Sequence, residues 1–582
     1  MSKNSFLVDL RPNRNLLDPN FSGYKLSLDS VPIYKKQVTQ GVDSIQPNDD
    51  QFSFAHVKLF SLQNHLHVNP FTNCVYFVDK RWNVTKIVIN LLNKLEDLET
   101  VWEIPPLQGD KKRLYNISMA FATSDLLVLS DGAGTAYLLS VRTIGNSERW
   151  EIITSFTLCD SGFLISSVQL EKFNTNELLH IVFMHVDQKE DKAKEIITTG
   201  FFHTIVEWVT LTKGQEEGPW IKKSHRKLEV DGNVEYIALE PGCKAVYIVG
   251  DKPPKWTYDT NNIDTAETEN KEETGSEPKL YSWSQNEEEI TIWVPTDDIK
   301  KHDLNINVDE KTLEVKIKGE VVIAGDFFNR IDKDLTSWSI EKDKLEIQLI
   351  KREVGLMWQD LILNDNRGEQ IYNPEVVGRV HEQLAHLCSD KEVDPGQPSF
   401  NSQQLEECDA MSCDTVVCVR MSAETHSASH EVSLSSFQWL FKVHCDPEKA
   451  PAICLRHDVD ACVWQFENTQ DSEKEWPYKH IGSFFAFGYV QASKNQKKYL
   501  TCPPDLSYAT VCETTRHIYI YRQPSAVTGE LRNRTSGKKV ETVSKQQLIN
   551  LETNEQILGV FATNSLLYVL TENIVHVLTV NE

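Results

Sequence analysis

The sequence lacks any apolar run long enough to cross a lipid bilayer, for which about 18 consecutive residues are needed. Leu126–Leu129 and Phe484–Phe487 are typical of its longest apolar runs. The first residues, Met1–Arg14, also lack the apolar core of a secretory signal. We therefore expect a protein of the cytoplasm and the nucleus that makes no contact with a membrane.

Cysteine is too sparse for a disulfide framework, with 12 residues in 582, and thiols stay reduced in those compartments. The densest group is Cys408, Cys413 and Cys418, followed by His426 and His430. Structural zinc sites usually use two pairs of ligands, with about two to four residues inside each pair. The group here has the widest of these spacings and no second pair. We expect buried or loop cysteines rather than zinc ligands there, no metal site elsewhere and no cofactor.

Motifs for catalysis are also missing. The chain contains no phosphate-binding loop and no nucleophile elbow, and a hairpin turn explains Gly132–Gly134. His381 and His386 resemble part of a metalloprotease helix, but they stand five positions apart, about 140° around a helix, where that motif needs four. We therefore predict no catalytic residue and no enzymatic activity.

Positive charge is in deficit. The chain has 60 basic and 85 acidic residues and a formal charge of −25, which argues against direct binding of nucleic acid or of an anionic membrane. The basic clusters Lys111–Arg113 and Arg532–Lys539 are short, and we expect solvated loops there, with a nuclear signal or a local nucleic-acid contact as the alternatives. Residues 259–279 carry a net charge of −5 and little apolar surface, which is typical of a linker.

Short apolar runs separated by turn residues dominate the sequence on both sides of this linker. A strand–turn–strand unit recurs among them: Ile117–Leu129 resembles Ile557–Leu570, and Val234–Val249 is a weaker third copy. Recurrence of one hairpin near both ends of a chain is typical of a β-propeller, in which each blade repeats the same sheet. Chance similarity among amphipathic hairpins is the alternative.

Strict alternation of apolar and polar residues begins after the linker. It covers four segments, Ile290–Val294, Leu304–Val308, Leu313–Ile317 and Leu345–Leu349. Because successive side chains of a strand point to opposite faces, this pattern predicts strands with one buried face. Several such strands in a short segment indicate a compact antiparallel β-sandwich.

An ordered series of motifs in this segment resembles the CS domain of the NudC family. The series comprises Tyr281–Gln285, Ile290–Pro295, Leu313–Gly319, Gly325–Phe328, Ser337–Glu341 and Leu349–Lys351, and it ends at Met357 and Trp358. NudC itself usually carries two tryptophans at that end, so Met357 departs from the family pattern. The resemblance implies a p23-like sandwich that assists Hsp90-linked folding of client proteins, with propeller-containing proteins prominent among the clients.

Together these patterns predict an all-β chain. A β-propeller is assembled from N- and C-terminal segments, long enough for seven blades, and an antiparallel β-sandwich of the CS (p23-like) type is inserted between two blades. The ends of such an insertion should lie close together. The predicted parts are residues 1–250 for the N-terminal part of the propeller, 251–277 for an acidic linker, 278–363 for the CS domain, 364–400 for a connection with a helix at 374–387 and a loop after it, and 401–582 for the C-terminal part of the propeller.

Four tryptophans of the CS segment, Trp283, Trp293, Trp338 and Trp358, are candidates for protein binding, because tryptophan is frequent at interface hot spots. A small sandwich also needs large buried side chains, so at least two of them are expected in the core. The leading hypothesis is a non-enzymatic co-chaperone or adaptor that binds clients and Hsp90-linked machinery through the CS domain and a propeller face. The alternative is an interaction scaffold in which the propeller alone binds partners and the CS domain has no chaperone activity.

Overall fold

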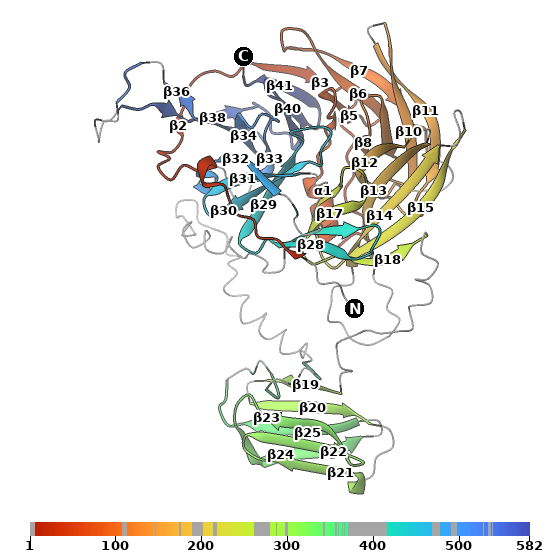
Figure 1. Ribbon diagram of the computed structural model, residues 1–582, viewed down its shortest axis with the longest axis vertical. Coiled ribbons are helices and arrows are strands. Elements are labelled where there is room, and N and C mark those ends of the chain that lie inside the picture. Colours follow the sequence, from red (N-terminus) through yellow and green to blue (C-terminus); the bar gives the residue numbers. More distant parts are fainter. Residues whose placement is uncertain are drawn as a thin grey trace. The chain divides into compact units, whose positions relative to one another are not determined.

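The chain forms two β-rich units in the computed structural model (Figure 1). The larger unit consists of Met1–Thr265 and Leu405–Glu582, and the smaller unit of Ala266–Gln404. No helix within the described residues is long and apolar enough to span a membrane. The structure describes residues 6–581 apart from 108–112, 146, 174–175, 189–201, 214–217, 261–279, 287, 297–300, 342–343, 356–357, 359, 364, 366, 371–415, 468–475, 477, 490–496, 528, 533–536 and 538.

In the described part of the larger unit, seven sheets of four or five strands stand around one centre as the blades of a propeller (Figure 1), which confirms the predicted fold.

Blade 1 contains β4 (His67–Asn69), β5 (Cys74–Val78), β6 (Asn83–Ile89) and β7 (Leu95–Glu103); blade 2 contains β8 (Ser118–Phe121), β9 (Leu126–Ser130), β10 (Thr135–Ile144) and β11 (Ser147–Thr157). Blade 3 contains β12 (Leu164–Phe173), β13 (Asn176–Gln188), β14 (Phe202–Lys213), β15 (Trp220–Val230) and β18 (Lys255–Asp259); blade 4 contains β16 (Val234–Leu239), β17 (Ala245–Gly250), β27 (Val417–Ser422), β28 (Ala428–Ser433) and β1 (Phe6–Leu7). Blade 5 contains β29 (Phe437–Val443), β30 (Ala452–His457), β31 (Asp460–Phe466) and β32 (Tyr478–Phe484); blade 6 contains β33 (Lys497–Thr501), β34 (Tyr508–Glu513), β35 (His517–Arg522), β38 (Lys545–Asn550) and β2 (Lys25–Leu26); blade 7 contains β39 (Ile557–Ala562), β40 (Leu566–Thr571), β41 (Ile574–Thr579) and β3 (Ile33–Gln37). Shorter elements are η1 (Arg14–Leu16), α1 (Phe54–Leu62), η5 (Phe487–Tyr489), β36 (Ser525–Ala526) and β37 (Thr542–Val543).

Apolar packing between neighbouring blades holds this ring together. Seven clusters of buried residues each join two adjacent blades, and one of them joins blade 7 to blade 1. Every residue of β17 and of β40 is buried, because a blade has a neighbour on each face. The three recurring hairpins of the sequence form β8–β9, β16–β17 and β39–β40, the two innermost strands of blades 2, 4 and 7.

The N-terminal segment closes the ring and follows the outer edges of four consecutive blades. Strand β1 pairs with β28 of blade 4, β2 with β38 of blade 6, and β3 with β41 of blade 7. Between β1 and β2, the backbone N–H of Asn13 donates to Nδ1 of His480 in blade 5 at 2.9 Å. An N-terminal strand therefore completes the blade that the C-terminal strands build, and exposed sheet edges are covered.

The smaller unit is inserted inside blade 4, not between two blades as the sequence predicted. Strand β17, which precedes the insertion, pairs directly with β27, which follows it, and Gly250 lies opposite Val417. The two ends of the insertion are therefore neighbours in one sheet, as an inserted domain requires. Lys255–Asp259 also corrects the predicted linker, because these residues form β18 on the edge of blade 3.

Helix α1 and the residues after it lie at the centre of the propeller (Figure 1). The Ser53 side chain caps the helix by accepting from the His56 backbone N–H. Beyond the helix, the Tyr499 hydroxyl of blade 6 donates to the Gln63 carbonyl at 2.7 Å. The Asn64 amide donates to the Val560 carbonyl of blade 7 at 2.7 Å. This segment therefore ties the innermost strands of different blades together.

The described part of the smaller unit is a sandwich of a five-stranded sheet, in the order β24-β25-β20-β19-β26, and a three-stranded sheet, β21-β22-β23. The alternating apolar residues predicted for the buried face form its core. Strand β26 lies in the predicted connection and pairs with β19, so the sandwich extends further than predicted. The helix predicted at 374–387 lies outside the described residues. The strands are β19 (Tyr281–Gln285), β20 (Glu289–Pro295), β21 (Leu304–Val308), β22 (Thr312–Ile317), β23 (Glu320–Asp326), β24 (Ile331–Glu341), β25 (Lys344–Lys351) and β26 (Gly368–Gln370), with η4 at Lys301–Asp303.

Replacing Asn64 with alanine should lower the free energy of unfolding of the propeller by about 1–3 kcal/mol, because backbone groups of Leu66 and Val560 lose their hydrogen-bond partner. Denaturant unfolding of the full chain measures the change. The matched control is Asn15→Ala, whose side chain is exposed. An effect of N64A no larger than that of N15A would contradict the role of this segment.

A second prediction concerns pH. His576 of β41 is fully buried, and neither ring nitrogen has a hydrogen-bond partner among the described residues. Burial together with Lys35 lowers its pKa to about 4, against a smaller opposite effect of Glu555. The unfolded chain therefore takes up this proton more readily, so the stability present above about pH 6.5 is lost as the pH falls towards 4. His576→Leu should flatten this dependence by up to roughly 3 kcal/mol.

Denaturant midpoints of the full chain at pH 7 and pH 4.5 measure this effect. His457→Leu, at a partly exposed position in blade 5, is the control. The same pH dependence in wild type and H576L would refute the assignment to His576.

Candidate protein-interaction surfaces

The outermost strand of the five-stranded sheet of the smaller unit, β24, presents apolar side chains to solvent. Leu335 is 61% exposed, Trp338 38% and Ile340 36%. We call these three residues the β24 edge. Trp338 lies opposite Ile347, and Ile340 opposite Leu345, both of which are fully buried. Trp338 and Ile340 thus continue the core-facing side of the sheet beyond the part that the second sheet covers.

Local backbone geometry contributes to this exposure. The pairing of β24 with β25 shifts between Asp332 and Ser337, and Leu335 lies within the irregular stretch. Such bulges are common at sheet edges and redirect side chains. The Lys301 ammonium lies 5.4 Å from the centre of the Trp338 ring, which places a cation beside the exposed aromatic face.

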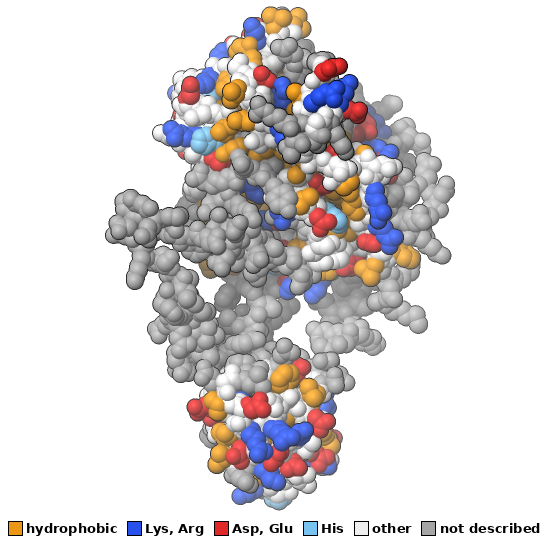
Figure 2. Space-filling model, turned by 90° about the vertical axis from the view of Figure 1, so that its left-hand side faces the viewer, with side chains coloured by type: hydrophobic (Ala, Val, Ile, Leu, Met, Phe, Trp, Pro, Cys, Tyr) orange, Lys and Arg blue, Asp and Glu red, His pale blue; other side chains and the backbone are white. Residues whose placement is uncertain are grey.

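Charged groups of both signs lie near the β24 edge. Figure 2 shows acidic and basic side chains interspersed with apolar ones on the visible face of the smaller unit. Lys333 lies 3.4 Å from Asp309, and both side chains are at least half exposed. Since exposed ion pairs contribute little free energy, the apolar residues are the part of this surface best suited to hold a partner.

Two of the four predicted tryptophans, Trp283 and Trp358, are buried in the core of the sandwich. The Gln285 side chain holds Trp358 by donating to its carbonyl and accepting from its N–H, at 2.7 and 2.8 Å. The Lys351 ammonium donates to the same Gln285 oxygen at 2.8 Å. This agrees with the expectation that at least two of the tryptophans pack inside. The neighbouring Met357 lies outside the described residues.

The other two tryptophans are separated by the sheet. Trp293 is partly buried, and its indole N–H donates to Glu346 at 2.9 Å on the face opposite the core. Trp338 lies on the core-facing side at the edge. The structure therefore does not bring the four tryptophans into one site. Leu335 and Ile340, which sequence reasoning did not single out, accompany Trp338 instead.

A second candidate surface is a cavity of about 510 Å³ at the centre of the propeller, lined by inner strands of all seven blades. Lys442 and Lys498 contribute cations to its wall, and the loss of surrounding solvent inside the cavity lowers both pKa values, that of Lys498 to about 8. Burial also lowers the pKa of His67 and of His444 to about 4, so both are neutral at pH 7. The Lys442 ammonium makes no hydrogen bond or ion pair with another described residue. The Glu235 carboxylate also lines the cavity but is paired with Lys58, so the wall still favours an anionic group.

The cysteine and histidine group of the sequence does not come together in the described residues. Cys418 is buried in β27 with its sulfur 3.0 Å from the Tyr478 hydroxyl, and His426 contacts Asp259 at 2.7 Å. Cys408 and Cys413 lie outside the described residues. Among the residues that the structure describes, side chains of metal-ligand type converge at Cys159, before blade 3, and at His185 and Glu207 in blade 3.

Removing the buried Trp358 side chain should destabilise the smaller unit by about 3–5 kcal/mol, as expected for an aromatic residue of a core. Trp338→Ala should cost less than about 1 kcal/mol, because that side chain is already partly in solvent. Scanning calorimetry of the full-length variants measures both. Equal losses for W358A and W338A would contradict the division into core and surface tryptophans.

Comparison with known proteins identifies the CS domain and relates the whole chain to one family. A CS domain family model matches residues 279–351. NudC domain-containing protein 1 of Mus musculus is 34% identical to this chain over 98% of each chain, and that of Xenopus tropicalis is 35% identical, also over 98% of each. Among solved structures, the WD40 domain of SCAP from fission yeast matches with 8% identity and a TM-score of 0.29, over 94% of this chain and 98% of its own. The similarity to the proteins of Mus musculus and Xenopus tropicalis over the full length shows that the chain belongs to the NudC domain-containing protein 1 family.

Proposed function

We propose that the protein is a non-enzymatic co-chaperone or adaptor, whose CS domain binds client proteins through the β24 edge. The observation that carries the proposal is the exposure of Leu335, Trp338 and Ile340 side by side on one edge strand. An unfolded or partly folded client exposes apolar segments, and an apolar edge among charged residues binds them while the charges keep the free protein soluble. Propeller-containing proteins are the clients that the family resemblance favours.

The propeller contributes a second contact in this proposal. The CS domain and the propeller belong to one chain, so a partner held by one unit meets the other at a raised effective concentration. Two contacts of modest strength then give a useful combined affinity. Hsp90-linked machinery is the proposed second class of partner, in the cytoplasm and the nucleus.

A second candidate function rests on the central cavity. Its wall has cations from Lys442 and Lys498 and is lined by all seven blades, a setting suited to an acidic side chain or a C-terminal carboxylate of a partner. In this scaffold hypothesis the propeller alone binds partners, and the CS domain has no chaperone activity.

The test compares full-length variants. Trp338→Ser combined with Ile340→Ser should abolish suppression of light scattering by a heated propeller protein and reduce recovery of chaperone-linked clients in pull-downs. Val321→Ser, which changes a 45% exposed side chain on β23 of the other sheet, is the matched control and should leave both unchanged. Calorimetric titration with purified Hsp90 tests that contact separately.

The scaffold hypothesis makes the opposite prediction. Lys442→Glu reverses one charge of the cavity wall and should then lose partners that the double variant at the β24 edge still recovers. Unchanged client recovery by W338S/I340S would overturn the role of the β24 edge.

A further inference from the structure

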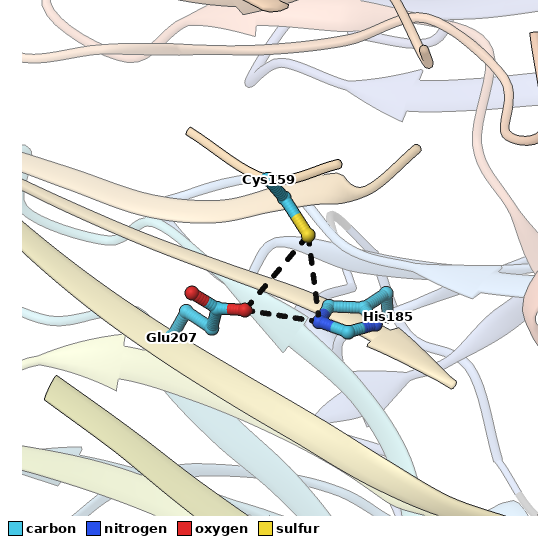
Figure 3. Close-up of side chains that lie close together, drawn as sticks. All are labelled: Cys159, His185 and Glu207. Carbon is cyan, nitrogen blue, oxygen red and sulfur yellow. Dashed lines mark hydrogen bonds and ion pairs between the residues drawn. The ribbon is translucent and has the colours of Figure 1, made fainter. Parts of the chain in front are cut away.

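Three side chains of different chemical type meet at blade 3 (Figure 3). Cys159 lies in the connection from blade 2, His185 on β13 and Glu207 on β14. The Cys159 sulfur is 4.0 Å from Nε2 of His185 and 3.9 Å from Oε1 of Glu207, and these last two atoms are 3.1 Å apart. One atom from each residue thus points to a common position, from which all three are about equally far.

The strand register explains why the two strand residues meet. Glu207 lies opposite Phe183, and His185 opposite Ile205, so His185 and Glu207 are diagonal neighbours on one face of the sheet. That face packs against blade 2, because Phe183 belongs to the cluster that joins blades 2 and 3. The side chains of His185 and Glu207 are 7% and 1% exposed. Rigid strands inside a packed interface therefore hold them in place.

The arrangement does not match a cysteine–histidine–acid catalytic triad. In a triad the acid binds one ring nitrogen and the nucleophile faces the other. Here the thiol and the carboxylate both approach Nε2 of His185. A thiol and a carboxylate that both lie near the same ring nitrogen instead have the geometry of three ligands around one shared ion.

We propose that Cys159, His185 and Glu207 form a zinc-binding site. Thiolate, imidazole and carboxylate are the three protein ligands of this metal, with usual bond lengths of about 2.3, 2.0–2.1 and 2.0–2.2 Å. Around one tetrahedral ion these lengths place sulfur about 3.5 Å from the nitrogen and from the oxygen, and those two atoms about 3.3 Å apart. The separations of 4.0, 3.9 and 3.1 Å differ from these by no more than about 0.5 Å.

Charge is consistent with this site. The thiolate and the carboxylate together balance the two charges of the ion. On binding, the Cys159 thiol proton and the Nε2 proton that His185 donates to Glu207 both leave to solvent.

Surrounding groups complete the site. His225 of β15 contacts Oε2 of Glu207, the carboxylate oxygen that does not face the cluster, as a supporting partner of a metal ligand does. Lys227 lies 3.4 Å from Oε1, but its side chain is 40% exposed and has room to turn into solvent when a metal takes that oxygen. Cys159 is only partly buried, which gives an ion a path from solvent.

Titration of the chelator-treated full chain with Co²⁺ alone tests the proposal. Binding at one site should produce the visible absorption of a tetrahedral ion and a near-ultraviolet thiolate-to-metal band, and added Zn²⁺ should abolish both. Zn²⁺ should also raise the midpoint of thermal unfolding, since the metal binds only the folded site. Cys159→Ser should remove the thiolate band, and His185→Gln should weaken binding at least about 10-fold.

The matched control is Cys74→Ser, which removes another partly buried cysteine outside the cluster and should leave the spectrum unchanged. Circular dichroism confirms that each variant is folded. Absence of one-site binding by folded wild-type protein, or a thiolate band that survives in C159S, would overturn the proposal and leave the cluster as an ion-pair network around Glu207.

Discussion

Closure of the propeller ring is the constraint on which the rest of the structure depends. Each blade is apolar on both faces and needs a neighbour on each side, so an open ring would expose the two faces that now meet between blades 7 and 1. Pairing of β3 with β41 fixes that closure, because the N-terminal strand completes the sheet made by the C-terminal strands. The hydrogen bonds of Asn64 and the buried His576 lie close to this junction, which makes both positions sensitive reporters of it.

The same constraint explains how a second domain is carried. A blade in a closed ring is held by both neighbours and by the hydrogen bonds between its own strands. An insertion between two of its strands therefore leaves those hydrogen bonds intact. Gly250 and Val417 remain partners across the whole insertion. The CS domain has its own core around Trp358 and therefore needs no packing from the ring to fold. The insertion therefore leaves the closure of the ring unchanged.

Much of the architecture was predictable because the sequence patterns that specify it involve residues close together in the chain. Alternation from Ile290 to Val294 and from Leu345 to Leu349 identified strands with one buried face, and the alternating Ile, Val and Leu residues of both segments are in the core. Recurrence of one hairpin identified the propeller. The place of the insertion was predicted wrongly, and β18 and β26 were missed, because these strands are recognised only through partners on β15 and β19. A short strand carries almost no sequence signal of which edge it joins.

The candidate sites also divide into features that the sequence determined and features that only the tertiary structure decided. The sequence by itself determined the composition of the chain, the CS motif series and the tryptophans that could act, because residue type and period-two patterning depend only on near neighbours. Only the tertiary structure decided that Trp358 is core and Trp338 is surface, since burial depends on what the second sheet covers. It alone placed Cys159, His185 and Glu207 together. Their wide spacing in the chain resembles no metal-binding motif, and the register of β13 and β14 is what makes them neighbours.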